Sequence, residues 1–264
     1  MNAASPILLF DSGVGGLTVY DALRKVLPDA PVIYAADLAG LPYGTKTEAQ
    51  IATRVAGLLG RMAERFQPRL ACIACNTAST IALGMVRDVL EIPVVGTVPA
   101  IKPAAALTQT GTIGLVGTDA TIRQAYVDDL EEKFGNGTRL LRVAAPGLVA
   151  AAEAKLRGQP VDPALIVDVH ARLAAMPGGS EIDTLVLACT HFPLLAEELA
   201  AAFGEGVTQI DGAAGIARRI AHLLEGQSFT ATGPNRFVVT GPLSGADGLQ
   251  AALAARRFGA AEAF

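Results

Sequence analysis

The stretch "LACIACNTAST", residues 70–80, contains an apolar run that stops at Asn76. A short apolar run that ends in Asn-Thr is typical of a buried strand leading into a helix. Cys72 and Cys75 both lie in this run. Because free cysteine is often buried, each could be a packed core residue. Cys75 stands at the turn itself, where the N–H groups of a helix start stabilise a thiolate, so it is also a candidate base or nucleophile.

Similar aliphatic runs recur along the whole chain and alternate with stretches of helical spacing. The runs cover residues 6–10, 31–36, 69–74, 92–96, 112–117, 139–144, 183–188 and 207–210. The helical stretches cover residues 45–66, 78–90, 119–134 and 193–203. Strands that are apolar on both faces and alternate with helices predict an α/β fold with mostly parallel sheets. In such a fold the ligand lies beyond the carboxyl ends of the strands.

Two of the strand ends resemble each other. "IACNTAS" (73–79) and "LACTHFP" (187–193) both run from apolar residues through Ala and Cys to a predicted helix start. Cys75 and Cys189 are about one domain length apart. We therefore predict two similar domains, each with one strand-end thiol of lowered pKa. The first would comprise residues 1–97 and 208–264, and the second residues 98–207.

The composition excludes several classes of protein. With 264 residues, 51% of them hydrophobic, the chain can bury a large core, which excludes disorder. The net charge of −4 and the absence of a basic run argue against nucleic acid as a partner. No apolar run reaches the roughly 18 residues of a membrane helix, and the N-terminus lacks a basic secretion signal. Three cysteines in a chain of this length argue against a disulfide framework, so we expect a soluble cytoplasmic protein with no membrane partner.

Two motifs could also indicate a zinc site or a phosphate-binding loop. Cys72 and Cys75, together with Cys189 and His191, could supply four zinc ligands. In a strand, however, residues separated by an odd number point to opposite faces, so we assign Cys72 to the core and expect no metal. "DSGVGGLTV" (11–19) lacks the glycine and lysine pattern of phosphate loops. Its glycines indicate either a tight turn or a close approach of backbone to a small ligand.

Taken together, the motifs identify a resemblance to the aspartate/glutamate racemase superfamily, and within it to the glutamate racemase family. The resemblance rests on "FDSGVGGLTV", "LPYGTKT", "IACNTAS", "VGTDAT" and "LACTHFPLL", and more loosely on "TGPLSGA". It implies that Cys75 and Cys189 are acid/base thiols facing each other across a substrate between two pseudo-symmetric domains. Asp11 would assist Cys75 and His191 would assist Cys189, with Glu153 as a further catalytic residue. The positions that would hold the substrate are Asp11, Ser12, Tyr43, Gly44, Asn76, Thr77, Thr190 and His191, and less decisively Thr118 and Thr121.

The chemistry that follows is racemisation of an amino acid by two bases. Inversion at the α-carbon needs a proton acceptor on one face and a donor on the other. No lysine stands at a strand end, so a pyridoxal Schiff base is unsupported and no cofactor is expected. By the resemblance, Cys75 takes the α-proton of D-glutamate and Cys189 that of L-glutamate, which supplies D-glutamate for peptidoglycan. A racemase of another amino acid, such as aspartate, and a non-catalytic binding protein on the same scaffold stay open.

The resemblance also implies a homodimer, and the short segment before Asp11 leads us to expect no activation by a cell-wall precursor. Three positions depart from the family's usual residues. Gly40 stands where an Arg is common, Gln124 where a Ser is common, and Ala188 where a Gly often precedes the second cysteine. None of these departures removes a base. They bear on loop stability, subunit contacts and substrate affinity.

Overall fold

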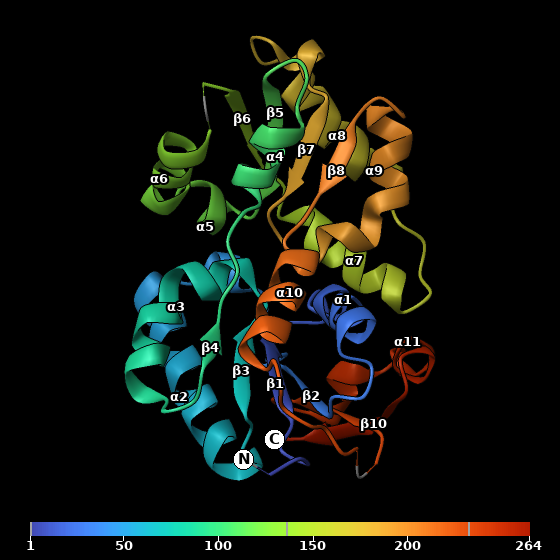
Figure 1. Ribbon diagram of the computed structural model, residues 1–264. Coiled ribbons are helices and arrows are strands. Elements are labelled where there is room, and N and C mark those ends of the chain that lie inside the picture. Colours follow the sequence, from blue (N-terminus) through green and yellow to red (C-terminus); the bar gives the residue numbers. More distant parts are fainter. Residues whose placement is uncertain (1, 136, 232) are drawn as a thin grey trace.

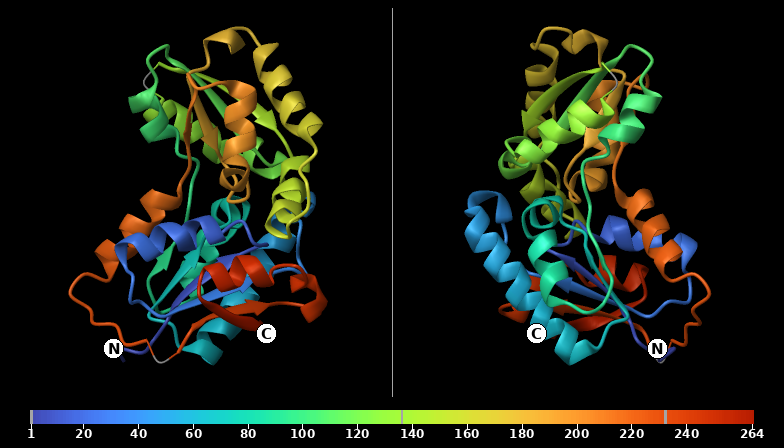
Figure 2. Two further views of the ribbon diagram at one scale, coloured as in Figure 1. Left: turned by 90° about the vertical axis from the view of Figure 1, so that its right-hand side faces the viewer. Right: turned by 60° about the vertical axis from the view of Figure 1, so that its left-hand side comes forward.

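The computed structural model describes residues 2–135, 137–231 and 233–264, which form two lobes (Figure 1). The chain passes from the first lobe to the second between strand β4 (Val94–Val95) and helix α4 (Ile101–Leu107). It returns between strand β8 (Thr208–Ile210) and helix α10 (Ala213–Leu223). Figure 2 shows the same two-lobed shape from two further sides.

A six-stranded sheet in the order β10-β9-β2-β1-β3-β4 forms the centre of the first lobe. All of its strand pairs are parallel, and Ile7 of β1 lies opposite Val32 of β2 and Leu70 of β3. Its other strands are β1 (Ile7–Asp11), β2 (Val32–Ala36), β3 (Leu70–Ile73), β9 (Asn235–Val239) and β10 (Phe258–Ala263). Every residue of β1 is buried, and all of them are apolar except the last, Asp11.

Helices cover both faces of this sheet. Helices α1 (Leu17–Val26), α10 and α11 (Gln250–Ala255) pack on the face that receives Ile7 and Leu9. Helices α2 (Glu48–Phe66) and α3 (Asn76–Val89) pack on the opposite face. Helix α2 begins where Thr47 and Gln50 form a capping box, each side chain bonded to the other's backbone N–H.

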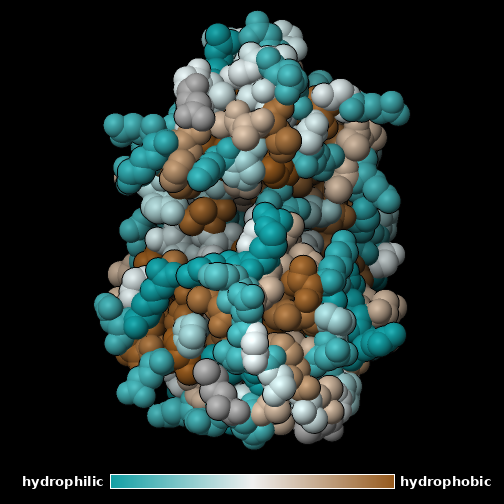
Figure 3. Space-filling view, in the orientation of Figure 1, coloured by the Kyte–Doolittle hydropathy of each residue, from teal (hydrophilic) through white to brown (hydrophobic). Residues whose placement is uncertain are grey.

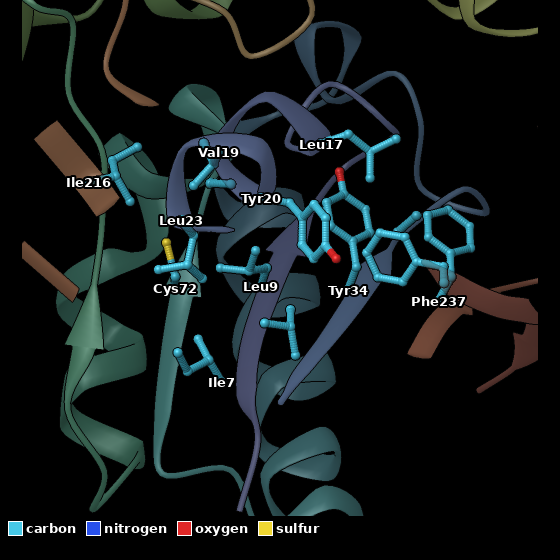
Figure 4. Packing of buried hydrophobic residues seen from close by; sticks show 14 of the residues in the cluster. Ile7, Leu9, Leu17, Val19, Tyr20, Leu23, Tyr34, Cys72, Ile216 and Phe237 are labelled. Atoms are coloured by element: carbon cyan, nitrogen blue, oxygen red, sulfur yellow. The ribbon is translucent and has the colours of Figure 1, made fainter. Parts of the chain in front are cut away.

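The two faces of the sheet separate two of the cysteines. Cys72 is fully buried beside Leu9 and Leu23 in the first-lobe core, as Figure 4 shows. Cys75 belongs to the core cluster on the other face, with the side chains of α2 and α3. The predictions that Cys72 is a core residue and that it faces away from Cys75 are therefore confirmed.

The second lobe contains a four-stranded parallel sheet in the order β6-β5-β7-β8. Helices α4 and α6 cover one face, and α7, α8 and α9 cover the other. The remaining elements are β5 (Thr112–Gly117), β6 (Arg139–Ala144), β7 (Thr184–Leu187), α5 (Asp119–Ile122), α6 (Ala125–Phe134), α7 (Gly147–Leu156), α8 (Pro163–Ala174) and α9 (Ala196–Phe203). Strand β8 pairs with β7, so this sheet continues to residue 210.

The α/β fold with parallel sheets is confirmed, and every predicted strand is present. The single helix predicted for residues 119–134 is wrong, because the backbone at Gln124 is extended and separates α5 from α6. The helix predicted from Pro193 begins as a 3-10 turn, Phe192–Leu195, before α9. Strands β9 and β10 were not predicted.

On the face seen in Figure 3, polar and apolar groups are mixed. The large hydrophobic side chains that are exposed come from several elements, among them Met85 and Val89 of α3. Among the described residues, no helix is both long and apolar enough to span a bilayer.

Candidate active site

A small enclosed cavity of about 110 Å³ lies at the carboxyl ends of strands from both lobes. Both strand-end thiols, Cys75 and Cys189, line it. The other predicted residues in its wall are Ser12, Tyr43, Gly44, Asn76, Thr77, Thr118, Thr190 and His191. Leu41, Pro42, Thr45, Asp119, Pro146 and Val149 complete the lining. A cavity of this size is suited to a small metabolite.

Cys75 stands where β3 gives way to α3 and acts as the N-cap of that helix. Its sulfur accepts the backbone N–H of Ala78 at 3.5 Å and lies 3.5 Å from Ser12 Oγ. Burial and the nearby carboxylate of Asp11 raise the pKa of Cys75 to about 12, although the contacts with Ser12 and Ala78 oppose this shift. The predicted lowering of the Cys75 pKa is therefore wrong, because burial beside a carboxylate outweighs the helix start. At neutral pH Cys75 carries its proton.

Cys189 follows β7 in the second lobe and contacts a histidine. Its Sγ lies 3.8 Å from Nδ1 of His191, whose Nε2 lies 2.9 Å from Oε1 of Glu153. Burial alone would lower the pKa of His191, but the hydrogen bonds with Cys189 and Glu153 raise it well above its ordinary value. This direction favours the imidazolium form of His191, which lies between Cys189 and the carboxylate of Glu153.

Glu153 lies behind the cavity wall, on α7. Its Oε1 accepts the backbone N–H of Val14 at 3.0 Å, and its Oε2 accepts a hydrogen bond from Arg157. Burial alone would raise the pKa of Glu153, but the bonds with His191 and Arg157 lower it to about 2. A charged Glu153 thus keeps His191 in its protonated form.

Asp11 also lies behind the wall, between the two cysteine-bearing loops. Its Oδ1 accepts the Gly13 N–H at 2.9 Å and lies 3.5 Å from Ser12 Oγ, which contacts Cys75. Its Oδ2 accepts the hydroxyl of Thr190 at 2.9 Å. Burial raises the pKa of Asp11, against the opposing charge of His191. Asp11 therefore reaches Cys75 through Ser12 and reaches the Cys189 side through Thr190.

The glycine-rich loop after β1 passes close to side chains of the other lobe. A Cβ on Gly13 would lie 2.6 Å from Glu153 Oε1, and a Cβ on Gly15 would lie 2.6 Å from His191 Nδ1. The close neighbours of these glycines are thus protein groups of the second lobe. The lack of side chains at these positions allows Glu153 and His191 to reach the first lobe.

Tyr43 is held in the cavity wall by a buried carboxylate that the sequence interpretation did not place in the site. The Tyr43 hydroxyl donates to Asp37 Oδ2 at 2.6 Å, and Arg54 Nη2 donates to Oδ1 at 2.6 Å. A Cβ at Gly40 would lie 2.5 Å from Arg54 Nε. Gly40 stands where the family commonly has an Arg. Here the guanidinium near this loop is that of Arg54 from α2, and the absence of a side chain at Gly40 leaves room for it.

The possible zinc ligands do not converge, since Cys72 lies on the other face of the sheet from Cys75. Over the described ranges, no group of three His, Cys, Asp or Glu side chains is arranged to hold a metal ion. Of the other histidines, His170 is half-buried against Phe203 and His222 is exposed, so neither belongs to the cavity.

The fold and the site define a two-lobed α/β protein in which two thiols, one from each lobe, line the same cavity between the lobes. Residues 17–220 match the family model of the Asp/Glu/hydantoin racemases, and the chain belongs to this family.

Its similarity to individual members extends over most of the chain. It is 62% identical to the glutamate racemase of Sphingopyxis alaskensis over 227 residues, 86% of this chain and 85% of that one. Its structure resembles that of Escherichia coli glutamate racemase in complex with L-glutamate and the activator UDP-MurNAc-Ala. That match has a TM-score of 0.92 and 41% identity, and covers 98% of each chain. Glutamate racemase of Francisella tularensis in complex with D-glutamate matches with a TM-score of 0.79 and 28% identity, over 100% of this chain and 98% of that one.

Proposed function

We propose that this protein is a glutamate racemase that interconverts L- and D-glutamate with Cys75 and Cys189 as its two acid/base groups. The observation that carries the proposal is that these two thiols, one from each lobe, line the same small cavity. The similar proteins support glutamate as the substrate, because they are named glutamate racemases and two of the similar solved structures contain L-glutamate or D-glutamate.

In the proposed reaction, the α-carbon lies between the two sulfur atoms. Cys189 removes the α-proton of L-glutamate, and Cys75 delivers a proton to the opposite face to give D-glutamate. The raised pKa of Cys75 suits this direction, because the thiol carries the proton that it delivers. In the reverse direction Cys75 is the base and Cys189 the acid. Two thiolates at one cavity would repel each other, so one of the pair is protonated at each stage.

His191 and Asp11 would assist the transfers from behind the thiols. The protonated His191, 3.8 Å from Cys189 Sγ, can donate a hydrogen bond to that sulfur when it becomes a thiolate. Asp11 would act on the Cys75 side through Ser12. Glu153 keeps His191 charged and fixes its ring orientation.

The negative charge that develops on the substrate needs fixed donors around it. Helix α3 starts at the cavity with Asn76 and Thr77, so its first N–H groups are suited to a substrate carboxylate. Ser12, Gly44 and Thr190 also line the cavity, and the hydroxyls of Ser12 and Thr190 contact Asp11 behind it. The Tyr43 hydroxyl is already bonded to Asp37, so we propose that Tyr43 shapes the cavity with its ring.

The decisive experiment is incubation of L- and D-glutamate in deuterated water with wild type, Cys75→Ser and Cys189→Ser. Two-base catalysis predicts deuterium at the α-carbon of the product and loss of racemisation in each variant. Cys72→Ala is the matched control, because Cys72 is buried away from the cavity, and it retains racemisation. Robust racemisation by either serine variant would exclude the assigned pair. Absence of any α-proton exchange in the wild type would favour a binding protein, and faster exchange on L-aspartate would change the substrate.

Further parts of the proposal concern the protein as a whole. We propose that it works without a cofactor, supplies D-glutamate for peptidoglycan and acts in the cytoplasm. We propose a homodimer with the exposed Met85 and Val89 of α3 at the subunit contact, and light scattering over a range of concentrations tests this. For the domains, we propose that the first comprises residues 1–97 and the C-terminal segment. Since β8 pairs with β7, that segment would begin near residue 211.

A further inference from the structure

Arg157, at the carboxyl end of α7, contacts both lobes. Its Nη1 donates to the carboxylate of Glu153 and, at 2.9 Å, to the backbone oxygen of the same residue. Its Nη2 donates to the backbone oxygen of Gly245 at 3.1 Å. Gly245 lies in the 3-10 turn Leu243–Ala246 of the first lobe, which is the lobe that α7 faces in Figure 1. Arg157 therefore joins a residue behind the cavity to the opposite lobe.

The charges behind the cavity balance only when Arg157 is included. Asp11 and Glu153 are two buried carboxylates, and His191 is one buried cation. Tyr34, Cys72, Cys75 and Cys189 are further titratable groups close to this cluster. Arg157 supplies the second positive charge, and its side chain is only 20% exposed. Removing one partner from a buried set of charges leaves an uncompensated charge, which is strongly unfavourable.

The surrounding backbone leaves room for this arrangement. A Cβ on Gly248, which has a φ of +79°, would lie 3.2 Å from Arg157 Cβ. A Cβ on Gly13 would lie 2.6 Å from Glu153 Oε1. Both glycines belong to the first lobe, so that lobe is shaped to receive the Arg157–Glu153 pair.

We propose that Arg157 is a positioning residue for the reaction: it holds Glu153 against His191 and links this pair to the contact between the lobes through Gly245. This inference rests on the proposed function, in which His191 assists Cys189. Without Arg157, Glu153 accepts a proton more readily and its carboxylate is free to turn away from His191. The proton transfer at Cys189 then slows, while the transfer at Cys75 is affected less.

The test compares Arg157→Met and Arg157→Lys with a matched control, Arg172→Met. Arg172 also pairs with a carboxylate four residues earlier, Asp168 at 3.3 Å, and with a backbone oxygen, that of Ala144 at 3.0 Å. Its pair is exposed and lies away from the cavity. Thermal unfolding of all three variants shows whether each is folded at the assay temperature.

We expect Arg157→Met to lower kcat on the order of 10- to 100-fold, as misplacement of a catalytic group does. We expect Arg157→Lys to recover part of the loss and Arg172→Met to match wild type. L- and D-glutamate have equal free energies, so any variant must lower kcat/KM equally for the two enantiomers. Kinetic isotope effects are therefore needed to show which of the two proton transfers has slowed. With L-glutamate, Cys189 removes the α-hydrogen, so the isotope effect of α-deuterium rises in Arg157→Met. With D-glutamate, Cys189 delivers a solvent-derived proton, so the solvent isotope effect rises instead. Wild-type kcat, or isotope effects that change equally for both enantiomers, would overturn the proposal.

A second measurement does not depend on catalysis. Carbon NMR of the glutamate carboxyl groups, with the Glu153 signal assigned by its loss in Glu153→Gln, gives the titration midpoint of Glu153. We expect this midpoint to move to higher pH in Arg157→Met and to stay unchanged in Arg172→Met. An unchanged midpoint in Arg157→Met would remove the electrostatic basis of the inference. If the wild type fails to racemise glutamate while the midpoint still moves, the proposed function fails and the role of Arg157 toward Glu153 stands.

Discussion

Glu153 Oε1 lies 2.9 Å from His191 Nε2, and both side chains are shielded from solvent. The contact joins α7 to the loop after β7, so it connects two segments of the second lobe behind Cys189. A buried ion pair of this kind makes both the activity and the stability of the protein depend on pH.

The first prediction concerns acid stability. The folded-state pKa of Glu153 is about 2, below its ordinary value of 4.5. The stability that its ionisation contributes is therefore complete above about pH 4.5 and is lost as the pH falls toward 2. We expect Glu153→Gln to be less stable than wild type at neutral pH, and the difference to shrink as the pH falls through this window. Urea unfolding at a series of pH values checks this, and a constant difference would contradict it.

The opposite sign applies to His191. Its folded-state pKa is raised, so its contribution to stability is complete below its ordinary value of 6.5 and is lost as the pH rises through the folded-state pKa. We expect His191→Asn to lose stability relative to wild type at neutral pH and to approach wild type at alkaline pH. The same urea series measures this, with the exposed His222→Asn as the control.

Thiol labelling tests the protonation state of Cys75. With a pKa of about 12, its thiolate fraction rises about tenfold per pH unit between pH 7 and 9. Alkylation of Cys75, followed by mass spectrometry of its peptide, should accelerate by that factor in the native protein. Cys72, which is fully buried, should remain unlabelled in the same samples. A rate for Cys75 that is independent of pH in this range would show that the thiol is already ionised.

The hydroxyl donors of the site can be removed singly. Thr190→Val deletes the 2.9 Å bond to Asp11, and Thr77→Val removes a hydroxyl that lies 3.1 Å from Thr118 Oγ1 in the cavity wall. We expect each variant to raise the barrier by about 3 kcal/mol, on the order of a 100-fold loss in kcat/KM. Thr80→Val is the control, because Thr80 bonds only to backbone oxygens of α3. Wild-type turnover in either variant would refute the electrostatic account of the site.

The carboxylate behind Tyr43 gives a prediction about substrate binding. Arg54→Met removes the cation from Asp37, which then keeps its bonds with Tyr43 and Thr240. We expect a loss of about 1–2 kcal/mol in stability, since Arg54 is partly exposed, and a rise in KM larger than the fall in kcat. Arg61→Met on the same helix is the matched control. An unchanged KM would mean that the Tyr43 loop does not depend on this ion pair.

The sequence predicted the strand ends well, because each buried strand of a parallel sheet is a short aliphatic run that ends at a polar residue. Both thiols follow from that pattern, whereas most of the other wall residues were expected from the resemblance to the racemase family. Strand β10 escaped prediction because "FGAAEA" contains no β-branched residue, and β9 because its apolar part is only "FVV". Edge strands such as β10 also bury fewer side chains.

The side chains behind the cavity could not be predicted from local sequence. Arg157, Arg54 and Thr240 lie in helical or loop stretches of ordinary polarity and acquire their roles only through tertiary contacts. The rise in the pKa of Cys75 could not be predicted for a related reason. A helix start is visible in the sequence, whereas burial beside Asp11 depends on how β1 and β3 are paired.

The arrangement of the strands also has a consequence for synthesis of the chain on the ribosome. The second sheet is built from one continuous segment, residues 112–210, whereas the first sheet needs β9 and β10 from residues 235–263. The second lobe can therefore acquire its native strand order while the first still has an uncovered edge at β2. We expect a chain released from the ribosome after residue 230 to contain a protease-resistant second lobe and a first lobe that is still cleaved.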